Sequence, residues 1–373
     1  MEKRVLLTAV ATLTGTAIGA GFLGIPHVIS KSGFIIGLIQ LIIISLLVMF
    51  TNLCLGEVIL RTKGNHQLPG YASLYLGKGA RIVMVLTMLF GIYSALIAYF
   101  IGEGQVLSFI FTNTPNYSLL FSFAFFIIVS FLVYFGIEAL KKGETIGIIA
   151  VLSIVIILAI IFSPKIKLSN LTYVSNNPIE WFFPYGVILF SFLSFSALPE
   201  VKQEIRGNEK VFKKAIIIGA LIPLIAYTIF TIAVIGFAGK ETPEIATIAL
   251  GKIPSLLAVF TMFTACFALS NALRDMYKLD LKIKYFYAWL LAVIMPFIIF
   301  LALYFLKLAT FIMVLEWSGV VSGGITGILA LLMLFKAKKK GKRAPEYEMK
   351  ISIPVIIIIS MLFIAGIIYQ LIF

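Results

Sequence analysis

The stretch GTAIGAGFLGIP, from Gly15 to Pro26, constrains the fold of this chain more than any other. It lies in an apolar segment suited to crossing a membrane, yet four glycines and a proline interrupt it. An interrupted helix leaves backbone N–H and C=O groups unpaired, and hydrocarbon tolerates this only where the break is buried in protein or lines a wet cavity. The stretch therefore predicts a binding site. The alternative is that its glycines only allow close helix packing.

The composition places the whole chain in a membrane. Of 373 residues, 61% are hydrophobic and 12% charged, and the mean hydropathy is +1.10, which excludes a soluble domain of this size. We predict an all-α polytopic membrane protein with eleven transmembrane helices, because a span needs about 20 apolar residues. The predicted spans are 5–29, 33–60, 82–111, 118–138, 145–163, 181–200, 212–237, 254–279, 285–306, 308–335 and 352–372.

The distribution of positive charge predicts the orientation. The net charge is +14, and most of the 30 basic residues fall in the N-terminal segment and in alternate loops. The opposite loops hold only Lys31, Lys165, Lys167, Lys240, Lys252 and Lys307. This bias predicts a multi-pass protein of the cell membrane with a cytoplasmic N-terminus and an extracellular C-terminus. The run KAKKKGKR (336–343) then reads as a topology anchor in contact with anionic lipid, and nucleic acid is not an expected partner.

The spans fall into two blocks of similar length, 5–163 and 181–336, each beginning with an interrupted helix. The counterpart of the first stretch is GVILFSFLSFSALPE, Gly186 to Glu200. Because five spans is an odd number, the second block lies inverted relative to the first. Interrupted helices at matching places in inverted repeats point to a transporter site near the membrane midplane. We therefore predict one transporter domain over residues 1–373, with 352–372 as an extra, peripheral helix.

At these residues the chain resembles the amino acid/auxin permease family of the amino acid-polyamine-organocation superfamily. Gly15–Pro26 is similar to that family's first-helix motif G-(T/S)-x-(I/V)-G-A-G-x-L-x-x-P, and 191–239 resembles its sixth and seventh helices, ending in Gly236–Gly239. The resemblance implies the leucine-transporter-type fold with a 5+5 inverted repeat and broken helices 1 and 6. It also implies an amino acid substrate driven by a proton or a sodium ion. The aromatic branch often has a histidine where this chain has Ser194–Ala197, so the resemblance does not imply an aromatic-only substrate.

A zwitterionic amino acid suits the two predicted breaks. The N–H groups of Gly19, Ala20 and Gly21 would bind its carboxylate, and carbonyls of the second break would bind its ammonium. Phenylalanines of the second break would wall the side-chain pocket, although ordinary packing would also explain them. The predicted substrate-binding residues are Thr16, Gly19, Ala20, Gly21, Phe190, Ser191, Ser194 and Phe195.

The span 254–279 carries Thr261, Thr264, Ala268, Asn271 and Asp275 at spacings that predict one inward-looking face. In the resembling fold this helix supplies hydroxyl ligands for sodium. Thr264 is followed by Ala265 instead of a second hydroxyl residue, which favours a proton as coupling ion, with no cofactor. Alternatively, Thr261 and Thr264 only bond to their own helix backbone.

Carboxylates inside spans are functional candidates. Glu316 lies about 12 Å from the predicted outer end of its helix at 1.5 Å per residue, and we predict that it carries the coupling proton. The alternative is a neutral acid that is hydrogen-bonded to a neighbouring helix. Glu103 is the second candidate, and Arg4 with Asp275 is a candidate cytoplasmic gate. Glu57, Glu138, Glu200 and Asp275 sit at inner helix ends, where solvated or ion-paired roles are expected.

The residues also weigh against other classes of function. The only histidines are His27 and His66, and no acid–base set typical of an intramembrane enzyme is present, so we predict no catalytic residues and no metal site. A sensor that binds an amino acid without transporting it is the remaining alternative. The sequence does not indicate which amino acid is bound or the oligomeric state.

Overall fold

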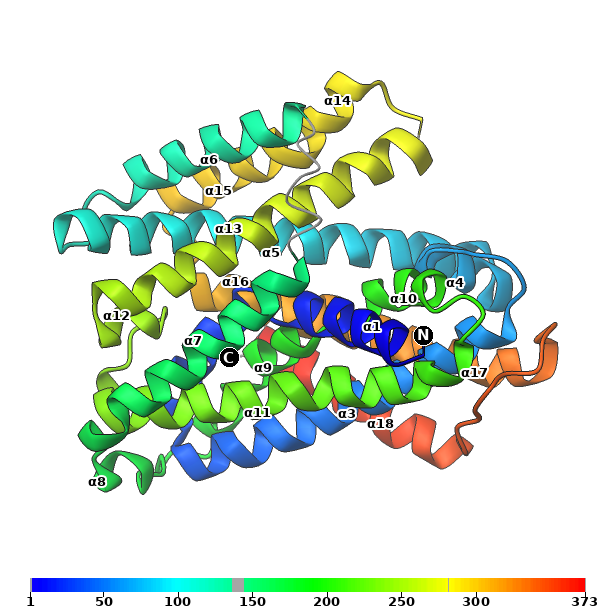
Figure 1. The fold of residues 1–373 in the computed structure, drawn as a ribbon, viewed down its shortest axis with the longest axis horizontal. Helices are drawn as coiled ribbons and strands as arrows, with labels where there is room; N and C mark the ends of the chain where they lie inside the picture. Colours follow the sequence, from blue (N-terminus) through cyan, green and yellow to red (C-terminus); the bar gives the residue numbers. More distant parts are fainter. Residues whose placement is uncertain (1, 136–143, 281, 373) are drawn as a thin grey trace.

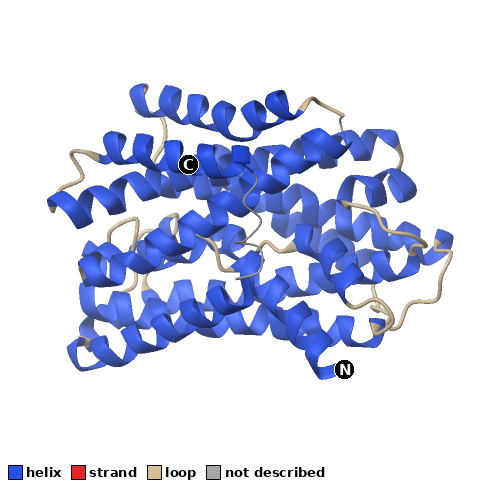
Figure 2. Ribbon diagram, turned by 45° about the horizontal axis from the view of Figure 1, so that its top comes forward, coloured by secondary structure: helices blue, strands red, loops and turns tan. Residues whose placement is uncertain are grey.

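The computed structural model describes residues 2–135, 144–280 and 282–372, and these are almost entirely helical (Figure 2). Ten helices in these ranges are long and apolar enough to cross a membrane, and a bent helix pair at the N-terminus makes eleven, as predicted. The spans are α1 with α2 (Glu2–Ala17 and Gly21–Ser32), α3 (Phe34–Arg61), α5 (Lys78–Thr112), α6 (Ser118–Phe135), α7 (Glu144–Phe162), α9 with α10 (Tyr185–Phe192 and Leu198–Glu204), α11 (Phe212–Ala238), α13 (Lys252–Asp275), α14 with α15 (Tyr285–Trp289 and Met295–Phe305), α16 with α17 (Phe311–Trp317 and Gly324–Lys340) and α18 (Ile353–Ile372).

Both predicted interruptions are present. Between α1 and α2 the chain leaves the helix after Ala17 and bends by 54° before re-entering it at Gly21. Between α9 and α10 it becomes extended at Leu193 (ψ 111°), and it passes through a 3₁₀ turn at Phe195–Ala197 before α10 begins. We call these segments the first break (residues 18–20) and the second break (residues 193–197).

The helices form two groups (Figure 1). One group contains α5, α6, α13 and α15, which pack against one another. Aromatic rings hold it together, and the rings of Phe126 and Phe297 stack with centroids 3.8 Å apart. Phe100 lies edge-on or tilted to four rings of the same cluster, those of Phe125, Phe126, Phe297 and Phe300. Interlocked rings of this kind make a stiff framework.

The second group contains the broken helices together with α3 and α11. Here α1 packs on α11 and α10, and α2 packs on α9. Thr12 of α1 donates to both carboxylate oxygens of Glu204 in α10, at 3.0 and 3.1 Å. Lys202 of α10 donates to the carbonyls of Ile59, Thr62 and Gly64 at the end of α3, where a helix dipole favours a cation. The half-helices α1 and α10 are thus tied to each other and to α3.

The segment after α17, residues 341–350, folds back over the end of α3, and we call it the strap. Its Tyr347 donates to Leu53 O at 2.8 Å, and the amide of Met349 donates to Glu57 at 2.5 Å. Glu57 is fully buried and pairs with Arg61 at 2.7 Å, which confirms the ion-paired role expected for it. Lys338 and Arg343 of the predicted lipid anchor also bond within the protein, to Met349 O and to Leu60 O respectively.

Connecting segments hold short helices that the hydropathy did not predict. Leu68–Leu76 forms α4, packed on α5, in a region expected to be a loop. On the opposite side of the bundle, Thr247–Leu250 forms α12. Glu138 and the expected inner-loop residues Lys141 and Lys142 lie outside the described residues.

The segment that precedes α12 covers one end of the first broken helix. We call this end of the bundle the α12 side and the opposite end the N-terminal side. His27 of α2 shares a 2.7 Å hydrogen bond with Thr242 O, and Ala246 N donates to Leu23 O at 2.9 Å. Glu244 accepts from the amide of Ile312 in α16. Ile245 and Ala246 are fully buried in this contact. The segment preceding α12 therefore covers the α12 side of the two broken helices.

Candidate substrate site at the two breaks

The two broken helices meet where α2 begins. A methyl group on Gly21 would clash with the hydroxyl of Ser191 and lie 2.8 Å from the ring of Phe190. Only glycine allows α9 to approach this closely. The first turn of α2 therefore lies directly against the last turn of α9, and the predicted residues Gly21, Phe190 and Ser191 share one site.

Tyr227 of α11 links the two breaks. Its hydroxyl lies 2.8 Å from Ala17 O, at the end of α1, and 3.0 Å from Ser191 O, near the end of α9. These carbonyls lie where their helices are interrupted, so a side chain supplies the partner that the helix cannot. Tyr227 is buried and was not predicted from the sequence.

Tyr99 of α5 approaches the first break from the aromatic framework. The amide of Ala20 points at its hydroxyl oxygen, and a methyl group on Gly19 would lie only 3.1 Å from that oxygen. Tyr99 is buried, and Ala265 of α13 also faces Gly19. This residue too was missing from the prediction.

The structure corrects the expectation that three amides of the first break are free. Gly19 N donates to Ala17 O at 2.9 Å, closing a tight turn, so it is already used. The amide of Ala20 faces Tyr99. The amide of Gly21 has no backbone acceptor among the described residues, and it lies at the N-terminus of α2, where the helix dipole favours an anion.

The second break also differs in detail from the prediction. The carbonyls of Phe190, Ser191 and Ser194 each already accept a hydrogen bond, from Leu193 N, Tyr227 and Ala197 N. Among the described residues, no backbone amide donates to the carbonyls of Phe192 and Leu193, which leaves them as acceptors for an ammonium.

Some side chains of the predicted substrate-binding residues are buried or bonded to other helices, and others are exposed. Ser191 donates to Val187 O within its own helix, whereas Ser194 accepts from Asn52 of α3 at 3.0 Å. Phe195 is buried. Thr16 bonds to Thr12 O and is exposed, as is Ser196 of the second break.

The threonines of α13 bond to the backbone of their own helix, which was the alternative to a sodium site. Thr261 donates to Leu257 O and Ala258 O, and Thr264 donates to Phe260 O and Thr261 O, all within α13. The expected single inward face is not uniform either. Thr261 and Asn271 are buried, but Ala268 on the same stripe is exposed.

The two candidate carboxylates lie in different surroundings. Glu103 is fully buried on α5, one turn beyond Tyr99, and neither of its oxygens has a hydrogen-bond partner among the described residues. It lies against Phe263 and Cys266 of α13. Glu316 of α16 lies instead against α9 at Gly186, with Gln370 of α18 at 3.5 Å from one oxygen.

The expected gate residues are not joined in this structure. Asp275 pairs with its neighbour Arg274 at 2.8 Å, and Arg4 is exposed and forms no ion pair with any described residue. The gate therefore stays a prediction.

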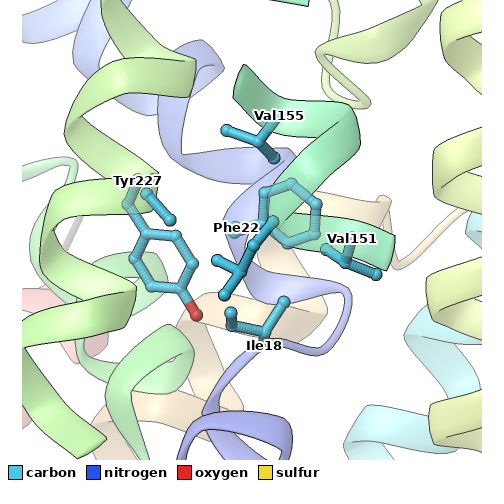
Figure 3. A pocket seen from close by; sticks show the side chains of 7 residues that line it. Ile18, Phe22, Val151, Val155 and Tyr227 are labelled. Carbon is cyan, nitrogen blue, oxygen red and sulfur yellow. The ribbon is translucent and has the colours of Figure 1, made fainter. Parts of the chain in front are cut away.

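A small apolar crevice, too narrow to admit a water molecule, adjoins the first break on the side of α7 (Figure 3). The ring of Tyr227 lies parallel to that of Phe22, 5.9 Å away, and Val151 and Val155 of α7 face them. The crevice offers no polar ligand beyond the hydroxyl that Tyr227 already uses.

Comparison with known proteins identifies the class of this architecture. Residues 2–248, about two thirds of the chain, match the tryptophan/tyrosine permease family. This chain belongs to that family. It is therefore a membrane transporter and not an enzyme. The match agrees with the class of amino acid permeases indicated by the sequence motifs, and assignment to the amino acid/auxin permease family itself stays a prediction.

Similar members of the permease class act on different amino acids. Glutamine transporter 2 of Aliivibrio fischeri is 26% identical over 88% of both chains. Tyrosine-specific transport system 2 of Haemophilus influenzae is 28% identical over 65% of this chain and 60% of its own length. The tryptophan-specific transport protein of Shigella flexneri is 25% identical over 62% of this chain and 57% of its own.

A solved structure agrees with the fold. MhsT, crystallised in complex with L-phenylalanine, superposes with a TM-score of 0.69 at 15% identity and covers 98% of both chains. This permease therefore has the leucine-transporter-type fold with broken helices 1 and 6.

Proposed function

We propose that this permease is a proton-coupled symporter that moves a neutral amino acid across the cell membrane by alternating access. The observation that carries the proposal is the meeting of the two breaks, bridged by Tyr227, with the amide of Gly21 and the carbonyls of Phe192 and Leu193 left for a ligand. A donor at a helix N-terminus suits a carboxylate, and acceptors at the end of α9 suit an ammonium.

The surroundings of the breaks support an uncharged substrate side chain. The side chains that contact them are aromatic or small and uncharged, as in Phe190, Tyr99 and Asn52. The relatives carry names that specify glutamine, tyrosine or tryptophan, and MhsT holds phenylalanine, all of which are neutral amino acids. We propose this class as the substrate and leave the individual amino acid to experiment.

Two observations support a proton over sodium as the coupling ion. The hydroxyls of Thr261 and Thr264 are occupied within α13, and the residue that faces Gly19 is Ala265, which has no oxygen to offer a hard cation. Glu103 lies one turn from Tyr99, which itself contacts the first break, and a carboxylate buried there without a donor is stable only when it holds a proton. We therefore place the proton on Glu103 and not on Glu316.

The exposure pattern fits a state open to the N-terminal side. The α12 side is covered, whereas Thr16, Ser196 and Ala268 are exposed although they lie in mid-span. We propose that this side faces the cytoplasm, consistent with the distribution of Lys and Arg.

The test is uptake into proteoliposomes that contain the purified protein, with labelled glutamine, tyrosine, tryptophan and phenylalanine. An inward proton gradient and an inward sodium gradient are imposed separately. We expect accumulation of at least one amino acid with the proton gradient alone.

The carboxylates provide the matched pair of variants. Glu103→Gln is expected to abolish gradient-driven accumulation while exchange of internal for external substrate continues, and Glu316→Gln is expected to accumulate substrate as the unaltered protein does. Loss of accumulation in Glu316→Gln but not in Glu103→Gln would move the proton to α16. Binding of an amino acid without uptake under either gradient would favour the sensor over the carrier.

A further inference from the structure

A second cavity, separate from the breaks, lies between α5, α15 and α16. Its volume is about 390 Å³, and its walls are apolar apart from Tyr93 and Ser94. The side chains of Phe90, Leu308 and Met313 at this cavity are 40 to 59% exposed. A cavity of this size and lining is suited to an apolar ligand.

The surroundings of this cavity determine which molecules can enter it. The helices that form it are membrane spans, so the exposed side chains around it face lipid acyl chains. Water does not fill an apolar cavity in contact with hydrocarbon. An extended apolar chain from the surrounding lipid is the molecule available to fill it.

The loop beside the cavity has an unusual backbone. α15 ends in a Schellman motif, in which Leu308 N donates to Leu303 O at 3.0 Å and Lys307 N donates to Tyr304 O at 3.1 Å. The motif folds Leu308 back beside Leu303, and both line the cavity. Lys307 occupies the left-handed position, with φ 56°, that glycine usually takes.

A lysine at this position indicates a use for its charge. A non-glycine residue in the left-handed region is strained, and such strain often marks a functional site. Lys307 is exposed and forms no ion pair with any described residue. It lies at the end of α15, immediately before the cavity residues Leu308 and Ala309, where its ammonium can meet a lipid headgroup.

We propose that this cavity binds one acyl chain of an anionic glycerophospholipid whose phosphate lies against Lys307. The cavity supplies the apolar contact, and the lysine supplies the preference for negative charge. The site is independent of the substrate and of the coupling ion.

The test is native mass spectrometry of the delipidated protein after addition of phosphatidylglycerol or phosphatidylethanolamine with identical acyl chains. We expect the unaltered protein to retain phosphatidylglycerol more strongly. One basic residue near a membrane surface contributes enough to give a preference of about fivefold.

Two variants separate charge from volume. Lys307→Asn keeps a residue that tolerates the left-handed backbone, so we expect it to lose the headgroup preference while still binding lipid. Ala309→Trp should fill the cavity and reduce retention of both lipids. Lys252→Asn, which removes another basic residue of the α12 side, is the matched control and should behave as the unaltered protein does.

The opposite results are equally clear. Equal retention of the two lipids by the unaltered protein, or an unchanged preference in Lys307→Asn, would overturn the assignment of the phosphate to Lys307. Unchanged lipid retention in a folded, monodisperse Ala309→Trp protein would overturn the cavity as the site.

Discussion

The two breaks solve the same problem by different means. The first break uses small residues, and its backbone groups are satisfied by a local turn at Gly19 and by hydroxyls from Tyr99 and Tyr227. The second break uses larger side chains, and its Ser194 is held by Asn52. Close approach to glycine, which the first break requires at Gly19 and Gly21, has no counterpart in the second, where Asn52 bonds to a side chain and not to the backbone. Tyr227 is the residue common to both.

Gly21→Ala is expected to have the largest effect, because it alters the close approach at the first break. The added methyl group would collide with Ser191 and Phe190, so α2 and α9 could not meet. Overpacking of this kind costs about 1–3 kcal/mol, and displacement of a binding geometry by about 1 Å costs about a hundredfold in rate. We expect uptake to fall by about that factor, measured in proteoliposomes.

The control for this variant is Gly79→Ala in α5, where an added methyl group would meet nothing within 4 Å. It should transport normally. Normal uptake by Gly21→Ala would show that the approach of α2 to α9 is not required.

Tyr227→Phe tests the connection between the breaks. The substitution removes the hydroxyl from Ala17 O and Ser191 O but keeps the ring stacked on Phe22. The single O–H proton is shared between the two carbonyls, and its removal leaves both without this donor. At a cost of about 1 kcal/mol in a membrane protein, we expect a KM for uptake about fivefold higher and a lower thermal unfolding temperature. Tyr117→Phe, at an exposed position, should change neither quantity. Unchanged KM and stability in Tyr227→Phe would show that the breaks do not depend on this hydroxyl.

Asn52→Ala is expected to have the smallest effect because it removes one hydrogen bond from the second break alone. A loss of about 0.6 kcal/mol corresponds to a KM about threefold higher. Substrate-dependent thermal stabilisation and uptake kinetics would measure it, with the exposed Asn116→Ala as the control. An effect larger than that of Tyr227→Phe would reverse the order of importance proposed here.

The sequence predicted the spans and the breaks because these depend on local composition. Apolar length defines a span, and the glycines clustered between Gly15 and Gly24, like the serines that precede Pro199, favour an interruption at those places. The partners of the breaks could not be predicted in the same way. Tyr99, Tyr227 and Asn52 are polar residues on long apolar helices, and their contacts come from helices far apart in the chain.

The carboxylates illustrate the same limit. Depth along the helix ranked Glu316 first, but depth does not say which way a side chain faces. The structure turns Glu316 toward α18 and Glu103 toward α13, beside the residue that contacts the first break. Tyr99 and Glu103 are four residues apart and so share one face of α5, which is the feature of the sequence that supports the proposal for Glu103.

The strap has a consequence for how the protein is made. Glu57 enters the membrane with α3, early in synthesis, and at that time Arg61 is its only partner among those seen in the finished protein. Lys338 and the amide of Met349 are translated almost 300 residues later. The end of α3 near Arg61 thus completes its contacts only after α17 and the strap have been made, so truncation after α17 would leave Glu57 without these later partners.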